Sequence, residues 1–136
     1  AKNPRAAAAE ETILGLLLLY PEQREAVASG AVLLEPEQFV TAFGRRAFEA
    51  IMRLHSEEGG FVFSLLGADF TPDEMGRLQS LEINRRSLSD NGAKALSDAV
   101  AVLLNSSEGT EKSLDDALAE KRQRLEAQRQ KRKNNT

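Results

Sequence analysis

The 136-residue chain contains no cysteine, no tryptophan and a single histidine. Without cysteine it can form no disulfide, no thiolate metal site and no cysteine nucleophile, and its composition fits a reducing compartment. His55 alone cannot build a multi-histidine metal site. We therefore expect no bound metal.

Long hydrophobic segments are also absent. The longest apolar run, Ile13–Tyr20, has eight residues, whereas a membrane-spanning helix needs about 20. The run lacks the basic flank and the small-residue cleavage site of a signal peptide. We expect it to form a buried core helix in a cytoplasmic protein that makes no membrane contact.

The sequence carries no motif for catalysis or phosphate binding. It has no G-x-x-x-x-G-K-[ST] loop, no G-x-G-x-x-G loop and no G-x-S-x-G elbow. Adjacent acids such as Asp115-Asp116 do not face each other on a helix, and the phenylalanines lie on apolar stripes typical of a core. We expect no catalytic residue, no cofactor and no enzymatic activity in this chain.

Helix-start and helix-stop signals recur along the chain. Asn3-Pro4 is an N-cap followed by proline at the first helical position, and Thr71-Pro72-Asp73-Glu74 is a complete capping-box pattern. Gly30 and Gly59-Gly60 are typical of helix ends. No segment offers a strand with a pairing partner, so the chain is predicted to be all-α. The predicted helices are 4–20, 21–29, a short one within 35–43, about 45–58, a short helix or buried loop in 61–70, one that begins at Pro72, one capped by Ser89 or Asp90, and one from Ser113.

The spacing of apolar residues suggests two subdomains. We expect a helical bundle over residues 4–88, a helical hairpin over 89–133, and a disordered tail over 134–136. The second helix of this hairpin has few large apolar residues, which can pack on the apolar stripe of the first. These residues are Leu114, Leu118 and Leu125, and the stripe comprises Leu96, Val100, Leu103 and Leu104.

Charge is unevenly distributed. Residues 1–119 hold 11 Lys and Arg against 19 Asp and Glu, a net charge of −8, whereas residues 120–136 carry +5. This basic end can be a solvated helix terminus, a contact for an acidic protein, or a contact for nucleic-acid phosphates. Its cations are Lys121, Arg122, Arg124, Arg129, Lys131, Arg132 and Lys133.

Two stretches resemble a known family. The segment AEETILGLLLLYPE (Ala9–Glu22) is similar to the opening of the helicase-binding C-terminal domain of bacterial DnaG-type primase. Phe39, followed by RAFEAIMRL (Arg46–Leu54), resembles a second element of that domain. The resemblance covers most of residues 5–104.

The N-terminal domain of the DnaB-type replicative helicase shares both elements and is the main alternative. That domain usually opens with Pro-Pro-x-x-x-x-Ala-Glu, which Asn3-Pro4-Arg5 matches only in part. We expect the basic end, Lys131–Thr136, to be the natural C-terminus, and this favours the primase domain.

The primase resemblance implies a primosome component that is monomeric and has no catalytic site. Its hairpin would bind the N-terminal domain of the replicative helicase, recruit primase to the fork and modulate the helicase, without contacting nucleic acid itself. Priming chemistry would reside in an upstream polymerase domain. The expected partner contacts are Leu114, Leu118, Arg122, Leu125 and Arg129. The helicase alternative would self-associate and bind primase, and a third alternative is a helical domain that binds nucleic acid through the basic tail.

Overall fold

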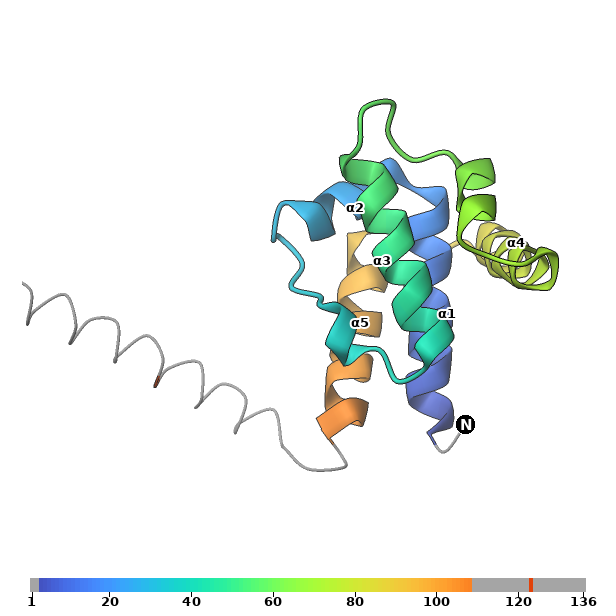
Figure 1. Cartoon of the computed structure of the whole chain (residues 1–136). Helices are drawn as coiled ribbons and strands as arrows, with labels where there is room; N and C mark the ends of the chain where they lie inside the picture. Colours follow the sequence, from blue (N-terminus) through green and yellow to red (C-terminus); the bar gives the residue numbers. More distant parts are fainter. Residues whose placement is uncertain (1–2, 109–122, 124–136) are drawn as a thin grey trace, which may run out of the picture.

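Helix α1 (Pro4–Leu19) lies at the centre of the fold, because α3, α4 and α5 all pack against it (Figure 1). The computed structural model describes residues 3–108 and 123. Over residues 3–108 its elements are helical, with no strand, which confirms the all-α prediction for this part of the chain. The other elements are α2 (Pro21–Ala28), the 3₁₀ helix η1 (Pro36–Gln38), α3 (Ala42–Ser56), the 3₁₀ helix η2 (Phe63–Ala68), α4 (Pro72–Arg86) and α5 (Ala93–Glu108).

The predicted caps form as the sequence indicates. Asn3 Oδ1 accepts a hydrogen bond from the Ala6 amide at 3.2 Å, and Pro4 occupies the first turn of α1. At the start of α4, Thr71 Oγ1 accepts from the Glu74 amide at 3.2 Å while Glu74 Oε1 accepts from the Thr71 amide at 3.0 Å. The chain turn after α3 uses positive φ angles at Gly59 and Gly60, as expected for a glycine stop.

Two predicted helix starts are wrong. Helix α3 begins at Ala42 rather than at Arg45, because Thr41 Oγ1 accepts from the Gly44 amide at 2.9 Å and caps the helix. Helix α5 begins at Ala93, so neither Ser89 nor Asp90 caps it. Instead, Arg85 Nη2 donates to the Asp90 carbonyl at 2.7 Å, and this bond is part of the loop before the helix.

One apolar core connects α1, α3, α4 and α5. On α5, Leu96, Val100 and Leu103 of the predicted stripe are buried in this core and Leu104 is half-buried, and α5 packs along α1. The second helix of the expected hairpin lies outside the described residues, as does the expected tail, so the bundle–hairpin division at 88/89 stays a prediction. The largest fully buried side chains are Ile13, Leu14, Leu16, Leu17, Ile51, Leu66, Leu78, Leu96 and Leu103.

Within the described residues, no helix combines the length and the apolar character that crossing a membrane requires.

The crossing of α1 and α4 is close at Gly15. A methyl group at this position would lie 2.8 Å from Arg85 Cβ and 3.0 Å from the Leu81 carbonyl oxygen. Both distances are shorter than ordinary van der Waals contact, so any side chain here would push the two helices apart.

We expect Gly15→Ala to lower the free energy of unfolding by about 1–3 kcal/mol, because the added methyl group overpacks the α1–α4 crossing. Gly76→Ala is the matched control. Gly76 lies exposed inside α4 with no atom within 4 Å of an added Cβ, so the same change should stabilise the chain by about 0.5–1 kcal/mol. Urea unfolding measures both, and equal effects at the two glycines would contradict the close crossing.

Candidate functional site

Glu10 is a residue of α1 whose buried carboxylate lies against the start of α3. Only 3% of its surface is exposed, and its Oε2 accepts from the Val40 amide at 3.0 Å while Oε1 accepts from Thr41 Oγ1 at 3.0 Å. It lies against the first turn of α3, where Gly44 leaves no room for a Cβ beside the carboxylate. Burial raises the pKa of the Glu10 carboxyl, and the hydrogen bonds oppose that shift. The group joins α1 to α3 and has a structural role.

Arg24 is a buried cation at the opposite end of α1. Its Nη1 donates to the Leu17 carbonyl at 2.6 Å and to the Leu18 carbonyl at 3.5 Å, and the guanidinium lies 4.4 Å from the Phe61 ring centroid. These carbonyls belong to the last turn of α1, where the helix dipole favours a positive charge. Burial lowers the pKa of Arg24. Arg24 thus closes the corner between α1, α2 and the chain after α3.

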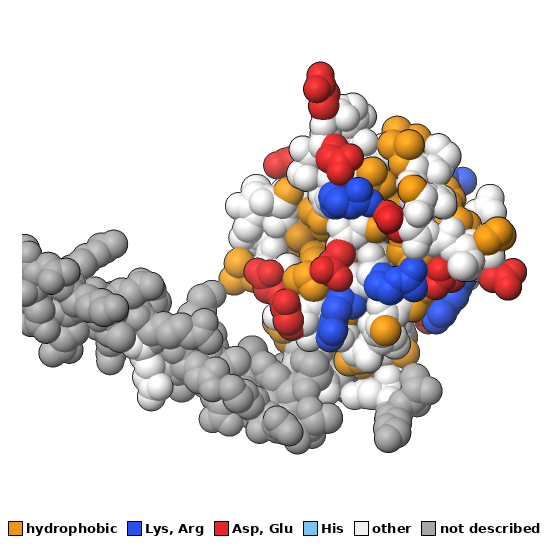
Figure 2. Space-filling model, viewed as in Figure 1, with side chains coloured by type: hydrophobic (Ala, Val, Ile, Leu, Met, Phe, Trp, Pro, Cys, Tyr) orange, Lys and Arg blue, Asp and Glu red, His pale blue; other side chains and the backbone are white. Residues whose placement is uncertain are grey.

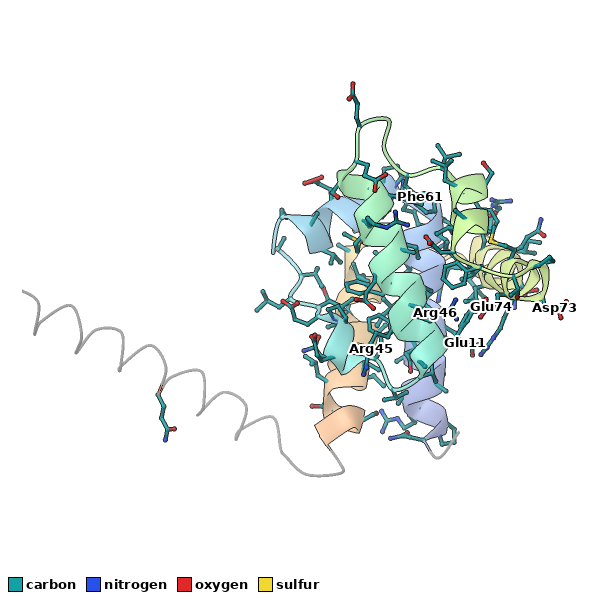
Figure 3. All side chains as sticks on the ribbon, viewed as in Figure 1. Glu11, Arg45, Arg46, Phe61, Asp73 and Glu74 are labelled. Atoms are coloured by element: carbon teal, nitrogen blue, oxygen red, sulfur yellow. The ribbon has the colours of Figure 1, made fainter. Side chains whose placement is uncertain are left out.

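A ladder of ion pairs crosses from α3 to η2 and α4. Arg46 Nη1 lies 2.8 Å from Glu74 Oε2, Arg46 Nη2 donates to the Asp69 carbonyl at 3.0 Å, and Arg53 pairs with the Asp69 carboxylate. Figure 3 shows Arg46 on α3, with Glu74 on the neighbouring α4. Arg46 holds the pKa of the Glu74 carboxyl down at about 2, and Glu74 in turn raises the pKa of Arg46.

The ladder lines a shallow groove of about 510 Å³. Its two arginines already have carboxylate partners, and Figure 2 shows acidic and basic side chains interspersed on the face that carries α3. A surface of mixed sign favours neither a polyanion nor a polycation, because each charge meets its opposite nearby. Such a surface suits a protein contact better than nucleic-acid binding.

A second groove lies between α1, α5 and the end of α4. This α1–α5 groove has a volume of about 380 Å³. Alanines and four charged residues, two basic and two acidic, contribute to its lining. The lining residues are Arg5, Ala8, Ala9 and Thr12 of α1, Arg85 and Asp90 of α4 and the following loop, and Ala95, Asp98, Ala99 and Val102 of α5.

Several large apolar side chains are exposed. Val62 and Leu65 lie at η2, Ile83 and Leu88 lie at the end of α4, and Leu33 and Val40 lie on either side of η1. Exposed apolar residues of this kind are normal on a protein surface. The residues are Leu33, Val40, Val62, Leu65, Ile83 and Leu88, each 45–61% exposed.

No metal-binding cluster is found in residues 3–108. In this part of the chain no group of three or more His, Asp or Glu side chains could hold a metal ion. His55 Nε2 lies 3.1 Å from Glu25 Oε2, so the single histidine joins α3 to α2. Phe39 and Phe48 are buried and stack at 4.9 Å, which confirms their core role over a base-stacking one.

The five residues predicted to bind a partner lie outside the described part of the chain. They are Leu114, Leu118, Arg122, Leu125 and Arg129. Glu10 and Arg24 were not among the residues predicted from the sequence to have a role. A signal existed for Glu10, since it follows Ala6 by four residues and precedes Ile13 by three, and so lies on the buried stripe of α1.

The low pKa of Glu74 predicts an acid-sensitive ladder. Because the folded-state pKa lies below 4.5, the ionised carboxylate stabilises the fold above about pH 4.5, and this contribution is lost as the pH falls toward about 2. Glu74→Gln should therefore be less stable than the parent at pH 7 and lose less stability than the parent between pH 5 and pH 3. Asp73→Asn is the matched control, because it removes a carboxylate of the same turn and keeps the Arg46–Glu74 pair. Thermal unfolding across this pH range measures the effect, and parallel pH profiles for the parent and Glu74→Gln would contradict it.

Comparison with known protein families finds a match over more than half of the chain. The model of the DnaB-like helicase N terminal domain matches residues 2–81, which include α1 to α3 and most of α4. Comparison with curated proteins and with solved structures finds no match.

This match corrects the primary interpretation of the sequence. The family is that of a helicase N-terminal domain and not the C-terminal domain of primase, so the assignments to primase, to a primase parent enzyme and to helicase recruitment are wrong. The assignment to DNA replication stands, and so does the helicase alternative, whose domain is non-catalytic by itself. The error arose because both families share the leucine spacing of α1 and α3, while the basic end that favoured primase lies outside the matched residues. The chain belongs to the family of DnaB-like helicase N-terminal domains.

Proposed function

We propose that this chain is the protein-interaction domain of a DnaB-like replicative helicase, acting in the cytoplasm at the replication fork. It would associate with further copies of itself and bind primase. The family match over residues 2–81 carries the proposal. The surface agrees with it, because the charged ladder on α3 is of mixed sign and its arginines are paired with carboxylates.

The contact residues proposed for this role remain those at the basic end. Leu114, Leu118 and Leu125 share one face of a 3.6-residue helix, and Arg122 and Arg129 lie at the border of that face. Leucines of this spacing can insert into a partner's helical groove, while the arginines set orientation and association rate. The acidic body, with a net charge of −8 over residues 1–119, offers complementary charge on a second copy.

The first experiment is sedimentation equilibrium of the whole chain at increasing concentration. We expect reversible self-association that is weakened at least about 10-fold, or 1.4 kcal/mol, by the double variant Leu118→Asp/Leu125→Asp. Ala127→Asp adds the same charge on the opposite side of the helical wheel and should leave association unchanged. A dissociation constant of about 1 mM corresponds to a binding free energy of only about −4 kcal/mol. A chain that stays monomeric up to that concentration would contradict the self-association part of the proposal.

Calorimetric titration with primase tests the second partner. We expect saturable binding that persists at moderate salt, since apolar contacts dominate it. The nucleic-acid alternative predicts a different result, namely binding to single-stranded DNA that collapses as salt rises. DNA binding of that kind without primase binding would replace the proposed function by the alternative.

A further inference from the structure

We propose that Asn91 is a chemical modification site of the folded chain, and that Arg85 controls the rate of the reaction. Asn91 loses its side-chain amide to the backbone nitrogen of Gly92, slowly and without an enzyme, and becomes aspartate or isoaspartate. The inference stands apart from the proposed function. It rests on the contacts of the Asn91 carboxamide, on the free amide of Gly92 and on the place of both residues just before α5.

The reactive pair is Asn91-Gly92, the only asparagine–glycine sequence in the chain. Asparagine is a chemically labile residue, and a following glycine makes it more labile because no Cβ shields the next amide nitrogen. Gly92 is exposed, and within residues 3–108 its amide donates no hydrogen bond. The nitrogen that has to attack is therefore open to the solvent base that removes its proton.

The reaction is a ring closure followed by hydrolysis. A hydroxide ion removes the amide proton of Gly92, and the nitrogen attacks Cγ of Asn91. A C–N bond forms, the bond from Cγ to Nδ2 breaks, and Nδ2 takes a proton from water and leaves as ammonia. Water then opens the succinimide ring. Breaking the new bond to Cγ gives aspartate, and breaking the bond from the nitrogen to the main-chain carbonyl carbon gives isoaspartate. Overall, water is consumed, ammonia is released and nothing is oxidised or reduced.

The carboxamide is held at both ends by residues that precede it. Arg85 Nε donates to Asn91 Oδ1 at 2.7 Å, and Asn91 Nδ2 donates to the Leu88 carbonyl at 2.6 Å. Ring closure has to turn the carboxamide toward the nitrogen that follows it. Because both of its ends are bound to the preceding chain, this turn requires the hydrogen bonds to break. The reaction therefore proceeds from a minor, locally opened state of the loop.

Arg85 is the contact that connects this loop to the helices. Its Nη2 donates to the Asp90 carbonyl at 2.7 Å, and its Cβ lies at the close α1–α4 crossing beside Gly15. From α2, Gln23 Nε2 donates to the Asn91 carbonyl at 2.9 Å. Gln23 holds only the main chain, whereas Arg85 holds both the main chain and the reacting group. The guanidinium donor is also charged, and hydrogen bonds from charged donors are the stronger ones.

The modification changes the start of α5. The Gly92 carbonyl accepts from the Ala95 amide at 3.0 Å and from the Leu96 amide at 3.4 Å, so it belongs to the first turn of the helix. Isoaspartate inserts an extra carbon into the main chain directly before this turn. Aspartate adds a negative charge next to Asp90, which lines the α1–α5 groove together with Arg85. The reaction thus alters one end of this groove irreversibly.

The first experiment compares the whole chain at neutral pH, folded in buffer and unfolded in guanidinium chloride, by mass spectrometry of its peptides. Cleavage by hydroxylamine, which attacks the succinimide, locates the ring. We expect modification of Asn91 in the folded chain at a rate at least about 10-fold below that of the unfolded chain, the factor that a hydrogen bond worth about 1.4 kcal/mol provides. Asn84 and Asn105, which lie within α4 and α5 and are not followed by glycine, should stay unmodified in the folded chain.

Two outcomes of this comparison would overturn the proposal. Equal rates in the folded and unfolded chains would show that the contacts of Asn91 do not control the reaction. A folded chain that stays unmodified over an incubation many times longer than the unfolded chain needs would show that Asn91 is not a site in the fold. Neither outcome depends on self-association or on primase binding.

Arg85→Met tests the control by Arg85. Methionine keeps much of the apolar stem and loses the donors, so the folded variant should react at least about 10-fold faster than the folded parent. The two unfolded chains should react equally, since Arg85 acts only through the fold. Arg86→Met is the matched control, because Arg86 pairs with Glu82 at 3.0 Å. Ile51→Val lowers stability at a buried position of α3 and should leave the rate at Asn91 unchanged. Equal folded rates for the parent and Arg85→Met would overturn the role of Arg85.

Gly92→Ala tests the attacking nitrogen. An added Cβ meets no atom within 4 Å and Gly92 has no positive φ, so the unfolding midpoint should stay close to that of the parent. The methyl group shields the nitrogen, and we expect modification of Asn91 to be lost over the same incubation in both the folded and the unfolded chain. Modification at the parent's rate would mean that water hydrolyses the side-chain amide directly, and it would overturn the attack by Gly92.

Discussion

Burying α1 between α3, α4 and α5 leaves the polar groups at both of its ends to be satisfied within the protein, and much of the remaining structure follows from how this is done. Asn3 caps the first turn, and Arg24 donates to the carbonyls of the last turn. Since Arg24 is carried by α2, this bond also fixes the corner at Pro21. Glu10 reaches from the middle of α1 to the amide of Val40 and sets where α3 begins. The two buried charges therefore lie where a helix end can stabilise each of them.

Local signals predicted most of the helix ends, because their causes lie within a few residues. The Thr71 capping box, the Asn3-Pro4 start and the Gly59-Gly60 stop all act through hydrogen bonds or φ angles of neighbouring residues. The predicted start of α5 was wrong because contacts from residues distant in the sequence help to place the loop before this helix. Arg85 binds the carbonyl of Asp90, and Gln23 Nε2 of α2 donates to the Asn91 carbonyl at 2.9 Å. Neither contact can be read from the capping preference of Ser89 or Asp90.

The family assignment failed for a different reason. The leucine spacing of Ala9–Glu22 reflects how α1 packs in the core, and this spacing resembles the primase domain as well as the helicase domain. Core patterns predict a fold, whereas function depends on surfaces that such patterns do not describe. The candidate contacts at the basic end follow from the primase resemblance together with charge and leucine spacing, and they lie outside both the described residues and the matched residues 2–81.

Helix α1 contributes both to the apolar core and to the wall of the α1–α5 groove, so one substitution in α1 can change both. Its Ile13, Leu16 and Leu17 are fully buried, while Arg5 and Ala8 line the α1–α5 groove one to three turns earlier. Changes at Ala8 can alter the groove without touching the core, but changes at Ala9 alter both. A binding defect at Ala9 therefore has to be compared with unfolding free energy before it is assigned to a partner. Unfolding free energy has to be compared for Glu10 variants as well, because loss of Glu10 would move the start of α3 and the ion-pair ladder that α3 carries. A partner contact made by that ladder would then weaken although Glu10 itself is buried.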